Sequence, residues 1–249
     1  MKFTIRMLSG GLLLGAWMMG GQMVGYAEEI LYQEDFEQVE IGQVPDGLEV
    51  VGVQDSAELN QPEQFGGMVE VNPDMQGDVN PSSHVFFLKD ASRGEEHAGI
   101  KITDLNFSQG TVAFKFYTST AARNGALLVR LVNAEGQVLA SFALYTTGHE
   151  LGHIHLNALG NYADRVLPGT KDLYMDKTWH QVELGYDGVG MKWSLRWDAH
   201  EFKDLNSDAR IIQTDVYAVE IFTGFEKASQ TTAYIDDIEI KKTGDSTHE

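Results

Sequence analysis

The sequence predicts an all-β protein, a two-sheet antiparallel jelly-roll β-sandwich. Roughly a dozen short segments are rich in β-branched and aromatic residues and are separated by Gly, Asp, Asn and Pro. Several of these segments alternate between apolar and polar residues, whereas convincing helical periodicity is not found between them. A chain of 249 residues is an ordinary size for a signal segment followed by one such domain.

The first and last strands that we predict, residues 30–37 and 233–242, are expected to be neighbours that close one sheet. Ile235, Ile238 and Ile240 have the branched side chains that favour a strand. In chain order, the predicted strands cover residues 30–37, 48–53, 67–71, 84–89, 98–103, 111–118, 126–132, 137–145, 179–186, 191–197, 216–223 and 233–242.

Residues 111–118 give the clearest strand pattern, with Val112, Phe114 and Phe116 on one side. Two turn segments, residues 133–136 and 187–190, lie between predicted strands and indicate two hairpins.

Tryptophan side chains have two roles in a protein of this class, core packing and stacking on sugar rings. Trp193 shares one face of its strand with Met191, Leu195 and Trp197. Because these neighbours are apolar, we expect Trp193 to be a core residue, and we expect the same of Trp179.

The start of the chain predicts a signal peptide over residues 1–27. Lys2 and Arg6 precede a long apolar segment, and Ala27 is a small residue at the expected cleavage site. A membrane anchor is the alternative, but polar residues and glycines interrupt the segment. We therefore expect a secreted protein with a single domain at residues 28–242 and a flexible tail at residues 243–249.

Charge and cysteine content narrow the classes of partner. The formal net charge is −19, which disfavours binding to nucleic acids or anionic membranes and is compatible with glycans and cations. There is no cysteine, so an exported domain has to be held by packing, with or without a bound ion. The sequence leaves the oligomeric state open.

Four short segments carry a resemblance to a known superfamily. They are residues 34–37 (EDFE), 45–47 (PDG), 178–182 (TWHQV) and 234–238 (YIDDI). Together they resemble the laminin-G-like and concanavalin-A-like jelly-roll domains. The resemblance implies a two-sheet sandwich that binds glycans on its concave sheet.

Residues 149–153 spell the zinc-peptidase pattern H-E-x-x-H, which needs a helix to bring two imidazoles to one metal. A capping box of Thr147 and Glu150 favours a helix. However, Leu156 and Leu159 stand where the extended pattern has Gly and His, and Gly152 weakens a helix interior. We therefore expect a strand here, with zinc peptidase activity at His149, Glu150 and His153 as the least favoured alternative.

The strand prediction brings together a different set of side chains. If the alternation places them on one face, a polar site is formed by Arg130, Ser141, Tyr145, His153, His155 and Asn157. Such a face would bind an extracellular polysaccharide without covalent chemistry. A polysaccharide lyase is the first alternative, in which Arg130 neutralises a uronate while Tyr145, His153 and His155 supply acid and base. A glycoside hydrolase on the same face is also open, although no E-x-D-x-E strand is present.

Acidic residues near the two ends of the domain suggest a structural calcium site. If the terminal strands pair, Asp35, Glu37, Asp236 and Asp237 converge, and carboxylate oxygens are the ligands that Ca²⁺ prefers. The alternative is a solvated acidic cluster that discourages aggregation at a sheet edge.

Overall fold

The computed structural model describes residues 28–51, 65–75, 79–90, 98–118, 127–147, 150–156, 165–167, 177–206, 211–223 and 232–243. The predicted signal peptide and residues 244–249 lie outside these ranges. Within the ranges the chain forms strands, turns and loops, and no helix there is long and apolar enough to cross a membrane.

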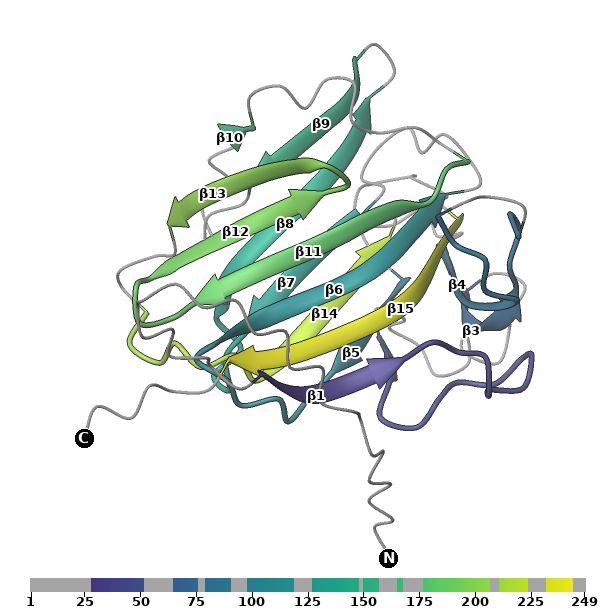
Figure 1. Cartoon of the computed structure of the whole chain (residues 1–249), viewed down its shortest axis with the longest axis horizontal. Helices are drawn as coiled ribbons and strands as arrows, with labels where there is room; N and C mark the ends of the chain where they lie inside the picture. Colours follow the sequence, from purple (N-terminus) through teal and green to yellow (C-terminus); the bar gives the residue numbers. More distant parts are fainter. Residues whose placement is uncertain are drawn as a thin grey trace, which may run out of the picture.

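Two antiparallel sheets make up the described part of the chain (Figure 1). The eight-stranded sheet contains β1 (Glu28–Glu34), β3 (Phe65–Val71), β4 (His84–Asp90), β6 (Gln109–Thr118), β11 (His180–Asp187), β12 (Lys192–Trp197), β13 (His200–Asn206) and β15 (Thr232–Thr243). Its order is β13-β12-β11-β6-β15-β4-β3, with β1 also paired to β15. The seven-stranded sheet contains, in order, β10 (Arg165–Val166), β9 (Glu150–Leu156), β8 (Val138–Thr147), β7 (Leu127–Val132), β14 (Ala218–Thr223), β5 (Ala98–Ile102) and β2 (Glu49–Val51).

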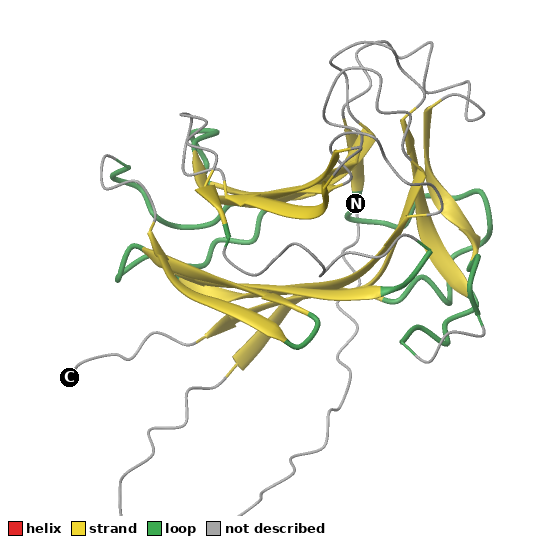
Figure 2. Ribbon diagram, turned by 90° about the horizontal axis from the view of Figure 1, so that it is seen from above, coloured by secondary structure: helices red, strands yellow, loops and turns green. Residues whose placement is uncertain are grey.

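Figure 2 shows the two sheets stacked and curved in the same direction. Their facing sides enclose the core, and the apolar rows predicted from the sequence lie there. Phe116 and Trp197 are fully buried and pack edge to face with ring centroids 6.4 Å apart. Trp179 and Trp193 are 2% and 4% exposed, so the prediction that they are buried rather than sugar-stacking residues is confirmed.

The last strand joins the two ends of the domain. One edge of β15 pairs with β6, while its other edge pairs with β4 over residues 232–235 and with β1 over residues 238–243. The register against β6 shifts between Asp236 and Glu239, which marks a bulge. The predicted pairing of the terminal strands is therefore confirmed.

Several features differ from the sequence prediction, among them the short strand β10, which was not predicted. The first strand was expected to continue to residue 37, but it ends at Glu34 because Phe36 has a left-handed φ of 59° and begins a turn. Strand β13 was not predicted. Its half-buried apolar residues, Phe202 and Leu205, are three apart because the register against β12 shifts, so the period of two is broken.

Candidate functional site

The outer face of the seven-stranded sheet is the concave face of the sandwich in Figure 2. Successive strand residues point to opposite sides of a sheet, so each strand supplies both faces. On β7, Leu127, Val129 and Leu131 belong to the core, while Leu128 and Arg130 face outward. This arrangement puts a cation on a strand that is otherwise apolar.

Arg130 is held by two neighbours on the adjacent strand β14. Its guanidinium carbon lies 5.5 Å from the ring centroid of Phe222, and its Nη1 is 4.0 Å from Oε2 of Glu220. Lys101 Nζ of β5 lies 3.5 Å from the other oxygen of the same carboxylate. The Glu220 carboxylate is therefore shared by two cations, and Glu49 of β2 lies opposite Lys101 in the register.

An apolar cluster lies beside this charged group on the same face. It consists of the buried residues Leu128, Ala143 and Phe222, with half-buried Val51 packed against them. Because Phe222 contacts Arg130, the charged and apolar parts adjoin one another. The buried ring of Phe222 thereby fixes the position of Arg130, whose side chain is 36% exposed.

The pairing register relates the residues that we predicted for the site. Ser141 is opposite Arg130, His153 is opposite Tyr145, and His155 is opposite Ala143. Residues directly opposite each other lie on the same face of a sheet, and so does every second residue along one strand. These backbone positions therefore belong to one face of the seven-stranded sheet. The structure describes the side chains of Arg130 and Ser141 in this set, and Ser141 is only 3% exposed. Asn157 lies outside the described residues, and the roles of all six stay predictions.

The segment with the zinc-peptidase pattern is a strand over its described part. Residues 150–156 form β9, which pairs with β8 and β10, as expected from the sequence. His149 lies outside the described residues. The pattern requires a helix to place two imidazoles on one metal, and β9 does not provide one.

Three residues of this face were missed by the sequence analysis: Lys101, Glu220 and Phe222. Glu220 was the available signal, because it interrupts the otherwise apolar run of β14. The sequence alone does not give the register that puts Glu220 opposite both Arg130 and Lys101.

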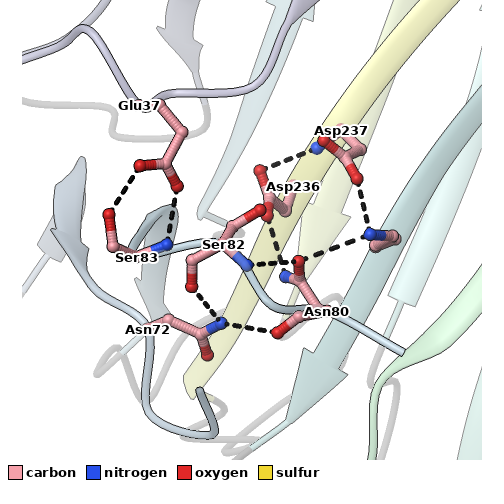
Figure 3. Close-up of polar contacts among 8 residues, drawn as sticks. Glu37, Asn72, Asn80, Ser82, Ser83, Asp236 and Asp237 are labelled. Carbon is pink, nitrogen blue, oxygen red and sulfur yellow. Dashed lines mark hydrogen bonds and ion pairs between the residues drawn. The ribbon is translucent and has the colours of Figure 1, made fainter. Parts of the chain in front are cut away.

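The acidic residues near the domain ends lie around the middle of β15, where its pairing changes from β4 to β1 (Figure 3). Glu37 accepts hydrogen bonds from the backbone N–H of Ser83 at 2.6 Å and of His84 at 3.1 Å, and from the Ser83 hydroxyl at 2.5 Å. Burial opposes ionisation, but these hydrogen bonds outweigh it and lower the pKa of Glu37. Glu37 therefore fixes the start of β4 to the turn after β1.

Asp236 is fully buried, which excludes the interpretation of these acidic groups as a wholly solvated cluster. Its Oδ2 accepts a hydrogen bond from Asn80 Nδ2, and its Oδ1 accepts one from the backbone N–H of Asp237, both at 2.8 Å. Burial raises the pKa of Asp236 to about 6 in spite of these bonds. Asp237 occupies the bulge with a φ of 47° and forms an ion pair with Lys115 at 2.5 Å.

The contacts around these carboxylates bear on the predicted calcium site. Asp35 accepts a hydrogen bond from the backbone N–H of Glu37 at 3.2 Å, and the other three carboxylates have the separate partners just described. Among the described residues, no three His, Asp or Glu side chains are grouped so that they could hold a metal. In the structure these carboxylates have separate partners, and a calcium ion held by them stays a prediction. A chelator that lowers the melting temperature, reversed by added Ca²⁺, would support it.

Comparison with known proteins identifies the fold. No protein-family model and no curated protein sequence matches this chain. Among solved structures, the CBM2 module of the evolved Dit of Lactobacillus casei BL23 phage J-1 is similar, with a TM-score of 0.56 and 12% identity over 90% of this chain and 99% of that one. Winged bean acidic lectin, in complex with methyl-α-D-galactose, has a TM-score of 0.51 and 9% identity over 87% and 99%.

A sialidase is similar with a TM-score of 0.57 and 10% identity over 85% of this chain. The match covers 18% of the sialidase, so this chain corresponds to a small part of that protein. The fold is a lectin-like jelly-roll β-sandwich. At these identities the likeness concerns the fold, and the fold prediction from the sequence is confirmed.

Proposed function

We propose that this protein is an exported glycan-binding domain that takes a polysaccharide on the outer, concave face of its seven-stranded sheet. The observation that carries the proposal is the position of Arg130, held between the Phe222 ring and the Glu220 carboxylate on that face. The lectin-like fold supports it, because jelly-roll domains of this kind bind sugars on the concave sheet.

The chemistry of the face matches that of a sugar chain. Arg130 and Lys101 are donors for hydroxyl or carboxylate oxygens, and Glu220 is an acceptor for hydroxyl groups. The adjoining apolar cluster is buried and supports the Arg130 guanidinium through the Phe222 ring. Arg130 is the group of this face that would pair with the carboxylate of an acidic glycan.

Affinity electrophoresis through gels that contain neutral or uronic-acid polysaccharides tests the proposal. We expect at least one polymer to retard the protein, and Arg130→Ala to weaken the apparent Kd by about tenfold, equivalent to one lost charge-assisted contact. Lys242→Ala is a matched control, because Lys242 pairs with Glu29 on the eight-stranded sheet, 2.9 Å away. Failure of every polymer to retard the protein would contradict the proposal.

A polysaccharide lyase is a second candidate on the same face. Arg130 is on β7, Tyr145 is on the adjacent strand β8, and His153 lies opposite Tyr145 on β9. This register favours a lyase over a hydrolase. In β-elimination a base removes the proton α to the uronate carboxylate, the bond to the leaving oxygen breaks, and an acid protonates that oxygen. Arg130 would neutralise the carboxylate while Tyr145, His153 and His155 exchange the protons. New absorbance from an unsaturated sugar would establish the lyase, and release of reducing ends without that absorbance would indicate a hydrolase.

A further inference from the structure

The outer face of the eight-stranded sheet contains a hollow of about 430 Å³, within the usual range for small-molecule sites. It lies on the opposite side of the sandwich from the concave face. Polar and small side chains from β6, β11, β12 and β13 line it, among them Gln109, Gly185, Asp187, Lys192, Ser194 and Asp204.

The floor of the hollow is the cross-strand pair Gly185 and Ser194. A glycine inside a strand weakens it and usually marks a bulge, a bend or the close approach of a ligand. The register of β11 is regular through Gly185 against both β6 and β12, so there is no bulge. A Cβ at this position would lie 2.6 Å from the Ser194 hydroxyl oxygen, and a larger side chain would fill the hollow.

The walls carry donors and acceptors in pairs. Gln109 Nε2 donates to Asp187 Oδ1 at 2.8 Å, and Lys192 Nζ lies 3.0 Å from Asp204 Oδ1. Burial opposes ionisation of Asp187, but hydrogen bonds from Gly190, Gln109 and Val189 lower its pKa, so it is an ionised acceptor at neutral pH. With Lys203, the lining holds two lysines and two aspartates, and its formal charges cancel in a chain of net charge −19.

A second, smaller hollow of about 140 Å³ lies further along the same face. It is lined by Lys115 and Arg196, whose charges are balanced by Glu183 and Asp237. Both hollows adjoin β11, and the stretch from Gln181 to Asp187 is about 20 Å long at the usual rise of a strand. The face therefore offers an extended series of paired donors and acceptors without net charge.

We infer that this face is a second saccharide site, which binds an uncharged oligosaccharide over the Gly185–Ser194 floor. A balanced lining gives no preference for an ionic ligand, whereas neighbouring donors and acceptors match sugar hydroxyls, each of which both donates and accepts. The site is independent of Arg130 and differs from the concave face in its preference for neutral sugars.

NMR titration of the isotope-labelled protein with neutral di-, tri- and tetrasaccharides, and with matched uronic-acid oligomers, tests the inference. We expect amide shifts at Gly185, Ser194 and Lys192 with a neutral sugar, unchanged in the Arg130→Ala variant. Gly185→Thr should weaken this binding by about tenfold, because the new side chain occupies the floor of the hollow. Gln33→Thr is the matched control, since it introduces the same residue at an exposed strand position of the same sheet.

The outcomes separate the two sites. Loss of neutral-sugar binding in Gly185→Thr, with binding to the concave face retained, supports the second site. Absence of shifts at Gly185 and Ser194 with every neutral sugar, or equal binding by wild type and Gly185→Thr, would overturn it. Loss of binding in Arg130→Ala alone would assign all sugar binding to the concave face.

Discussion

The outer faces of the two sheets present the same kind of ion pair in two different environments. Arg130 lies opposite Glu220 on the seven-stranded sheet, and Arg196 lies opposite Glu183 on the eight-stranded sheet. The Arg130 and Glu220 side chains are 36% and 15% exposed and adjoin a buried apolar cluster. Those of Arg196 and Glu183 are 55% and 33% exposed and line the smaller hollow.

This comparison shows that the surroundings of a cross-strand pair, rather than its residue types, decide its role. Solvent screens an exposed pair, which then contributes little to the free energy of unfolding. A less exposed pair beside an aromatic ring is screened less and should contribute more. The concave face therefore combines stability with a positioned cation, while the opposite face keeps its polar groups free to exchange partners with a ligand.

The largest expected effect is that of Phe222→Ala. It removes a buried ring from the outer face of the seven-stranded sheet, and the loss of burial plus the cavity should lower the free energy of unfolding by about 3 kcal/mol. Chemical denaturation measures this change. Gln181→Ala, on the exposed outer face of the other sheet, should change it by less than about 0.5 kcal/mol. Equal effects at the two positions would break the comparison.

The buried carboxylate at the β15 bulge should produce a pH effect of similar size. The pKa of Asp236 is about 6 in the folded state and about 3.9 in the unfolded chain, so the folded state binds the extra proton between these values. Stability should therefore fall by up to about 3 kcal/mol as the pH rises from about 4 to 7. Urea unfolding at several pH values measures the slope.

Asp236→Asn is the control for this dependence of stability on pH, because it removes the carboxyl group that titrates. Asn80 Nδ2 donates to Asp236, so the variant loses an acceptor and should be less stable overall, but the slope between about pH 4 and pH 7 should flatten. Glu37 and Asp187, whose pKa values are lowered, act in the opposite sense as the pH falls below about 4. An unchanged slope in Asp236→Asn would show that another group is responsible.

Glu220→Gln should have an intermediate effect. It leaves Arg130 and Lys101 close together without their shared counter-charge, so the free energy of unfolding should fall by about 1 kcal/mol. Because the face becomes more positive, the apparent Kd for an acidic glycan should decrease. Denaturation and affinity electrophoresis report the two quantities. A variant that is as stable as wild type would indicate that the pair is already screened.

The smallest effect should come from Glu183→Gln on the eight-stranded sheet. Its partner Arg196 is more than half exposed, so the free energy of unfolding should change by less than about 0.5 kcal/mol and become insensitive to added salt. A loss as large as that of Glu220→Gln would show that the two faces do not differ in the way described.

Much of the architecture was predictable because it depends on patterns within single segments. The alternation of Val112, Phe114 and Phe116 predicts the buried face of β6, and the turn at residues 133–136 predicts the hairpin of β7 and β8. The failures have local causes. A bulge changed the spacing of Phe202 and Leu205 in β13, and a left-handed Phe36 ended β1 before the acidic residues that were expected to lie on it.

By itself, the sequence determined the all-β class and most of the strands, because the period of two and the turn residues are local properties. Only the tertiary structure decided that Arg130, Glu220 and Lys101 meet, that Asp236 is buried while Asp237 is exposed, and that Gly185 faces Ser194 in a hollow. These contacts depend on the register between strands far apart in the chain. A shift of one residue would move every side chain to the other face, and the residues of a single strand do not show which register is adopted.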